Sequence, residues 1–136
     1  MANIRIPLKD TAPTPLPPGV YNVDVEKVSD LRTVEGSDGP VEVIDVTWKV
    51  SEGELEAGRK VIDTYWLLER AFWRVSILTM QLLGIKREDL PEFSSTEELN
   101  EFMKENFLNV PATIEVDVTE KNDQQRNRVK KVFARS

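Results

Sequence analysis

The side chains best suited to binding chemistry in this sequence are cations near its C-terminal end. Residues 121–136 hold six basic groups and one acid, a balance of +5, whereas the rest of the chain holds twelve basic and twenty-three acidic groups, a balance of −11. Guanidinium and ammonium groups bind phosphate oxygens. Because the Debye length is about 8 Å at physiological salt, local charge and not the net charge of −6 decides what a surface attracts.

Seven cations are candidates for contact with a nucleic-acid backbone. Alternation along the last expected strand puts Arg128 and Lys130 on one face, away from Val129. In a barrel, cations at the start of the third strand and on the outward face of the second could line the same groove. The seven are Lys49, Arg59, Lys60, Arg126, Arg128, Lys130 and Lys131. The competing interpretations are ordinary surface charge and lysines that protect an open sheet edge from aggregation.

Aromatic rings are the second requirement for holding a single strand, because bases stack on them. Tyr65 and Trp66 point to opposite faces of their strand, and Trp66 shares parity with Ile62. We therefore expect Tyr65 to be the exposed ring, with Phe133 as a second platform beside the cations. Of the other two tryptophans, Trp48 is expected in the core and Trp73 packed against the bottom of the barrel.

The composition argues against catalysis. The chain has no histidine and no cysteine, which removes the commonest general base, the commonest transition-metal ligand and any thiolate site. Asp45 and Asp63 are expected as outward carboxylates on neighbouring strands, but no glycine-rich phosphate loop or nucleophile–base pair accompanies them. We expect both to pair with nearby lysine or arginine, and we expect no enzyme activity, no catalytic residue, no metal and no cofactor.

The element that must position these residues runs from Gly58 to Ile85, a strand that leads directly into a helix. Residues 61–66 are rich in β-branched and aromatic side chains, and from Leu68 the apolar residues recur at helical spacing. Gly84 follows where a left-handed residue commonly ends a helix. The alternating patterns elsewhere predict strands at 20–28, 41–50, 112–118 and 128–133, and a second helix is expected after Ser95.

The expected order is three strands, a helix, an extra helix and two strands, an all-β fold with inserted helices. Five strands with a helix between the third and fourth match the OB-fold, a Greek-key barrel that binds oligonucleotides and oligosaccharides. A β-sandwich would need about seven strands and no long central helix. We expect residues 1–18 to form an extended proline-rich arm and residues 19–136 a single OB-fold domain.

Four short motifs resemble those of a family of small bacteriophage proteins that is regarded as single-stranded-DNA-binding with an OB-like fold. The motifs are Pro18-Gly19-Val20-Tyr21, Gly58-Arg59-Lys60-Val61, Trp73-Arg74 and Asn127-Arg128-Val129-Lys130. The resemblance covers roughly residues 15–133. It implies sequence-tolerant binding of single-stranded DNA in phage replication or recombination, in the host cytoplasm. The chain departs from bacterial single-stranded-DNA-binding proteins by ending KKVFARS, where those typically carry an acidic recruiting tail.

Protein partners are a second expectation. The acidic face of the helix around residues 97–105, or the proline-rich arm, could contact a replication or recombination protein, so the alternative is a protein-interaction module. We expect no membrane association, because no run approaches the roughly 20 apolar residues needed to span a bilayer. The sequence leaves open whether the chain forms a homo-oligomer.

Overall fold

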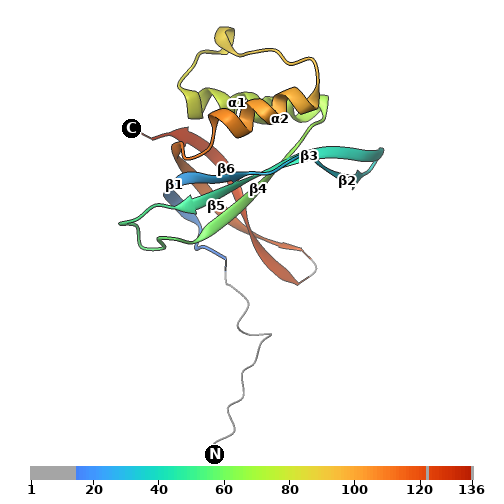
Figure 1. The fold of residues 1–136 in the computed structure, drawn as a ribbon. Coiled ribbons are helices and arrows are strands. Elements are labelled where there is room, and N and C mark those ends of the chain that lie inside the picture. The colour runs from blue at the N-terminus through green and yellow to red at the C-terminus, as the bar shows by residue number, and fades with distance from the viewer. Residues whose placement is uncertain (1–14, 122, 136) are drawn as a thin grey trace, which may run out of the picture.

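The computed structural model describes residues 15–121 and 123–135, which form an antiparallel sheet with two helices (Figure 1). The strands are β1 (Gly19–Val28), β2 (Arg32–Gly36), β3 (Gly39–Val50), β4 (Lys60–Trp66), β5 (Pro111–Lys121) and β6 (Gln124–Ala134). The helices are α1 (Phe72–Leu83) and α2 (Thr96–Asn106), with short 3-10 turns at Glu69–Ala71 and Arg87–Asp89. Both helices lie on the same side of the sheet. An all-β fold with inserted helices is therefore confirmed.

The sheet has six strands where five were expected, because residues 32–36, which were not predicted as a strand, form β2 beside β3. β1 and β2 both run antiparallel to β3, with Val28 opposite Val46 and Arg32 opposite Val43, so together they form a long hairpin with β3. β4 pairs with β3, β5 with β1, and β6 with β5. Within the described residues no pairing joins β4 to β6, so the sheet is not closed into a barrel.

The core lies between the inner face of the curved sheet and the two helices. Alternate residues of β1 and β3 point inward as predicted, and the Trp48 side chain is fully buried. The expected N-terminal arm is described only from residue 15 onward. There Leu16 is buried, and its backbone N–H and C=O bond to the side chain of Asn127 at 2.8 and 2.9 Å, so this end of the arm packs against β6.

The inward face of β4 is the reverse of the one predicted. Val61, Asp63 and Tyr65 are buried, whereas Ile62 is 61% exposed. The expectation that Tyr65 is the exposed ring is therefore wrong, since its side chain is only 2% exposed. The prediction took Ile62 and Trp66 as the buried side of the strand, which placed Asp63 on the outer face. Asp63 can lie inside because Arg74 of α1 pairs with it there.

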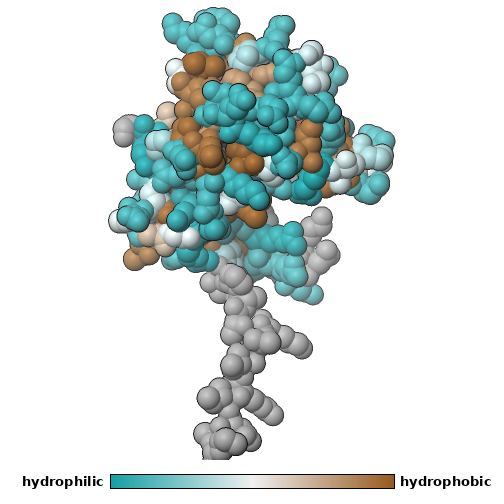
Figure 2. All heavy atoms as spheres, in the orientation of Figure 1, coloured by the Kyte–Doolittle hydropathy of each residue, from teal (hydrophilic) through white to brown (hydrophobic). Residues whose placement is uncertain are grey.

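Both helices follow the predicted patterns. In α1 the buried residues are Val75, Leu78, Thr79 and Leu82, and Gly84 ends the helix in the left-handed conformation at φ 63°. In α2 the Ser95 hydroxyl accepts from the Glu98 N–H at 3.1 Å, as the capping pattern predicts. Figure 2 shows that hydrophobic residues also reach the surface around the helices, among hydrophilic ones.

Candidate nucleic-acid interface

A groove runs between strands β4 and β6, which do not pair with each other in the described residues, and α1 forms its third wall. Its volume is about 430 Å³. The lining residues are Asp63 and Tyr65 of β4, Trp73, Arg74, Ile77, Leu78 and Gln81 of α1, and Val129, Lys130, Lys131, Val132 and Phe133 of β6. Of the nine site residues expected from the sequence, the groove brings together Tyr65, Lys130, Lys131 and Phe133.

A bulge in β6 turns two lysines outward side by side. Val129 lies opposite Val116 and Lys131 opposite Glu115, so β6 has one extra residue, Lys130, at this point. Strict alternation is broken there, and both Lys130 and Lys131 are exposed. A β-bulge commonly re-aims a side chain in this way. The groove therefore has two adjacent ammonium groups on its β6 wall.

Two exposed aromatic rings accompany these lysines. Trp73 is 61% exposed on α1 and Phe133 is 42% exposed on β6. Phe133 thus lies where a stacking platform was expected, but the expectation that Trp73 packs against the bottom of the barrel is wrong. Trp73 was not predicted as a site residue. Two signals could have identified it, because it falls outside the buried stripe of α1 and it precedes an arginine.

The groove floor is a buried charge network. The Arg74 guanidinium donates from Nη2 to both Asp63 carboxylate oxygens at 3.0 Å, and its Cζ lies 4.7 Å from the centroid of the Tyr65 ring. Burial raises the pKa of the Asp63 carboxyl despite the opposing effect of Arg74. Burial, together with the neighbouring Asp63 carboxylate, raises the pKa of the Tyr65 hydroxyl well above its ordinary value. This network holds α1 against β4 and fixes the Arg74 side chain.

Carboxylates on β5 offset part of the charge of β6. Arg128 forms two bonds to Asp117, at 3.2 and 2.5 Å, and the Lys130 ammonium lies 3.8 Å from Glu115. Arg126 donates to the Gln124 amide oxygen at 3.0 Å. Lys131 is exposed and forms no ion pair within the described part of the chain. Lys131 is therefore the cation of this wall whose charge is least offset.

The remaining candidate cations lie elsewhere on the sheet. Lys49 and Lys60 are opposite one another on β3 and β4, and Lys60 also reaches Glu26 at 3.0 Å. Arg59 lies 3.1 Å from Glu56 in the preceding turn. These three residues, with Arg126 and Arg128, are not among those that line the groove. The expectation that all seven cations share one groove is therefore wrong.

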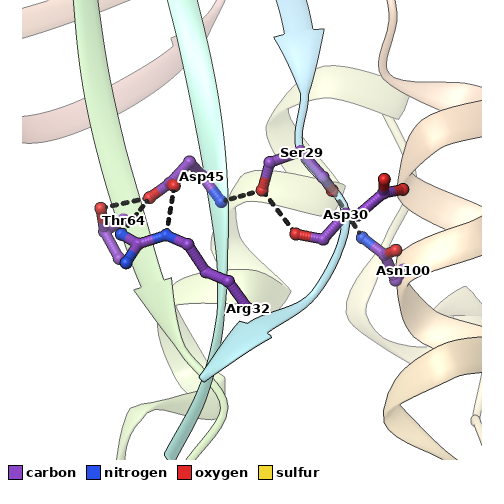
Figure 3. Close-up of polar contacts among 6 residues, drawn as sticks. All are labelled: Ser29, Asp30, Arg32, Asp45, Thr64 and Asn100. Atoms are coloured by element: carbon purple, nitrogen blue, oxygen red, sulfur yellow. Dashed lines mark hydrogen bonds and ion pairs between the residues drawn. The ribbon is translucent and has the colours of Figure 1, made fainter. Parts of the chain in front are cut away.

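The two aspartates that were both expected to point outward lie on opposite faces of the sheet. Asp45 is opposite Thr64 on the outer face, and Asp63 is opposite Val46 on the inner face. Asp45 accepts from Arg32 at 2.7 and 3.0 Å and from the Thr64 hydroxyl at 2.5 Å (Figure 3). The expected pairing of both aspartates with arginine is confirmed. Residues 15–121 and 123–135 contain no acidic cluster that could hold a metal ion.

Figure 3 also shows how Ser29 links strand β3 to helix α2. The Ser29 hydroxyl accepts from the Asp45 N–H at 2.9 Å, and the Ser29 carbonyl accepts from the Asn100 amide at 2.8 Å. The interruption between β1 and β2 is thereby tied both to β3 and to helix α2. The Arg32 guanidinium lowers the pKa of the Asp45 carboxyl.

Comparison with protein-family models and with curated proteins finds no match to this chain. The resemblance to phage single-stranded-DNA-binding proteins stays a prediction. In the described part of the chain, neither helix combines the length and apolar character that crossing a membrane requires.

Proposed function

We propose that this chain binds single-stranded DNA without strong sequence preference, in phage replication or recombination. The observation that carries the proposal is the groove between β4 and β6, where the exposed rings of Trp73 and Phe133 accompany Lys130 and Lys131. Single strands are typically held by a positive groove that follows the backbone and by rings on which bases stack. The groove supplies both kinds of contact on adjacent elements.

The architecture gives this proposal a second support. We propose that the sheet is an OB-fold in which β1 and β2 count as one interrupted strand. It then has five strands, with α1 between the third and the fourth. OB-folds are partly open barrels that commonly bind oligonucleotides, and the absence of β4–β6 pairing in the described residues is compatible with a partly open barrel.

The net charge of −6 limits where a polyanion can approach. The acidic groups would repel DNA over much of the surface, so binding should concentrate where cations outnumber acids. The residues that line the groove include three cations, Lys130, Lys131 and Arg74, and one carboxylate, Asp63. Arg74 is the ion-pair partner of Asp63. Lys130 also lies 3.8 Å from Glu115, so Lys131 is the lysine whose charge is more fully available for contact with phosphates.

The test is quenching of tryptophan fluorescence by a thymidine oligonucleotide across a salt series, compared with a duplex of the same length. Trp48 is buried and Trp66 half-buried, so Trp73 should be the main reporter. We expect saturable quenching by the single strand that weakens steeply as salt rises. Quenching that is independent of salt, or equal for the duplex, would count against the proposal.

The expected alternative, a protein-interaction module, is favoured by a different observation. A second groove on the far side of α1 is lined by apolar residues and by serine and threonine, and acidic residues neighbour several of them in the sequence. The two functions are compatible because they use opposite sides of one helix.

A further inference from the structure

Helix α1 separates two grooves of opposite character. Trp73, Ile77 and Gln81 face the groove described above, whereas Phe72, Val75, Ser76 and Thr79 face a second groove of about 380 Å³. At 100° per residue these two sets lie on opposite sides of the helix. The second groove is therefore a separate site and is independent of the DNA proposal.

The second groove lies beneath the connection between the helices. Residues 84–95 arch over α1 before the chain enters α2 (Figure 1), and apart from the turn Arg87–Asp89 they form no helix or strand. The connection contributes Leu90, Pro91, Phe93, Ser94 and Ser95 to the lining, and α2 contributes Thr96 and Leu99. Long irregular connections in compact domains are commonly functional.

The two phenylalanines of this groove are partly accessible, and its outer wall is held in place. Phe72 is 42% exposed at the start of α1, whereas Val75 and Thr79, which also line the groove, are buried. The Phe93 ring packs against Phe102, with centroids 5.1 Å apart, and Phe102 in turn contacts Phe107 at 6.0 Å. The arch is thus anchored to α2, so the groove beside it is pre-formed.

None of the lining residues is charged, but acidic residues neighbour several of them in the sequence. Residues 84–101 contain six acids and two bases, a balance of −4. Five of these acids are exposed on the arch and the first turn of α2, namely Glu88, Asp89, Glu92, Glu97 and Glu98. A ligand for this groove needs an apolar face for the floor and positive charge for the rim.

We infer that this groove binds a basic amphipathic helix of a partner protein. Amphipathic helices insert apolar side chains at i, i+3, i+4 and i+7 into hydrophobic grooves, and their polar sides meet the rim. Lysine or arginine on those sides would face Glu88, Glu92 and Glu97. The acidic rim would also repel DNA, which keeps the two ligands on their own sides of α1.

The probe is a synthetic 14-residue peptide of leucine and lysine with leucine at helical spacing, titrated against the full chain by fluorescence anisotropy. A peptide with glutamate in place of lysine is the charge control. We expect the lysine peptide to bind at least tenfold more tightly than the glutamate peptide. Equal affinity for the two peptides would overturn the inference.

Two matched variant pairs locate the binding site. E88Q/E92Q/E97Q should weaken binding of the lysine peptide at least tenfold, whereas E35Q/E52Q/E105Q, which also neutralises three exposed acids, should change it less than twofold. Phe72→Gln should weaken it similarly, while Ile77→Gln, on the other side of α1, should not. Equal losses within either pair would mean non-specific attraction and would overturn the inference.

Two further measurements distinguish this site from the DNA groove and from a surface for self-association. Phe72→Gln should leave oligonucleotide affinity unchanged, so failure of the DNA proposal would not affect this one. Light scattering of the unmodified chain should give the monomer mass. A dimer that Phe72→Gln dissociates would show that a second copy occupies the groove, and the partner-helix inference would then be wrong.

Discussion

Arg74 and Asp63 join helix α1 to strand β4 through a single guanidinium nitrogen that lies 3.0 Å from both carboxylate oxygens. The Asp63 side chain is 10% exposed and that of Arg74 is 32% exposed, so water screens the pair only partly. The same arginine donates to the Thr64 carbonyl at 3.2 Å. The pair therefore sets the position of α1, and with it the width of the groove that carries Trp73.

Arg74→Met should destabilise the protein by about 3 kcal/mol at pH 7, because it leaves a buried carboxylate without its partner. Urea denaturation followed by circular dichroism would measure the change. Arg32→Met is the matched control, since the Arg32 side chain is 49% exposed and surface ion pairs contribute only about 0–1 kcal/mol. Equal losses for the two variants would show that burial of Asp63 has no special effect.

The pH dependence of Arg74→Met follows from the raised pKa of Asp63. The folded protein favours the protonated form of the Asp63 carboxyl. The stability that Asp63 contributes is therefore present below its pKa in the unfolded chain, and it is lost as pH rises through its pKa in the folded protein. Without Arg74 the folded pKa should rise further and widen that window. The loss of stability in Arg74→Met should therefore shrink as pH falls toward the unfolded pKa of Asp63.

Asp63 also explains why part of the site was predicted wrongly from the sequence. Period-2 patterns identified the inward faces of β1 and β3, where the buried residues are apolar. In β4 the buried face contains an aspartate, and only the position of Arg74, eleven residues later, makes that possible. Parity within one strand could not reveal a partner supplied by tertiary packing.

Which of the distant cations lie close together in the folded protein also could not be predicted from the sequence. Which cations meet depends on strand pairing and on the bulge at Lys130, which no local pattern near Arg128 signals. Strand β2 was equally hidden, since the break that separates it from β1 depends on bonds from Ser29 to Asp45 and Asn100. The helices were predicted well because their caps and apolar stripes are local.

The cap of α2 offers a direct test of one such local signal. Ser95→Ala removes the hydroxyl that accepts from the Glu98 N–H, and we expect a loss of about 1 kcal/mol in the free energy of unfolding. Ser37→Ala, in the exposed β2–β3 turn, is the control and should be nearly neutral. A loss in Ser95→Ala no larger than in this control would mean that the cap contributes little.

Trp73 should contribute to DNA binding by stacking. Trp73→Ala should weaken oligonucleotide affinity by about 1–3 kcal/mol, the usual range for one base–aromatic contact. Because Trp73 is 61% exposed, the thermal midpoint should change little. Phe72→Ala is the matched control, since Phe72 lies on the other side of α1. Affinity measured by anisotropy of a labelled oligonucleotide should fall for the first variant only.

The salt dependence should separate the groove lysines from the other cations. Each phosphate contact to a single strand contributes about 0.7 to the slope of log affinity against log salt. Lys130→Ala with Lys131→Ala should therefore reduce the slope by about 1.4, whereas Lys49→Ala with Lys60→Ala, outside the groove, should leave it nearly unchanged. If the second pair lowers the slope as much as the first, DNA follows the outer face of β3 and β4 instead, where Lys49 and Lys60 lie opposite one another. Glu101→Gln with Glu105→Gln tests for a general charge effect, and we expect it to leave the slope unchanged, because these acids lie on α2, away from the groove.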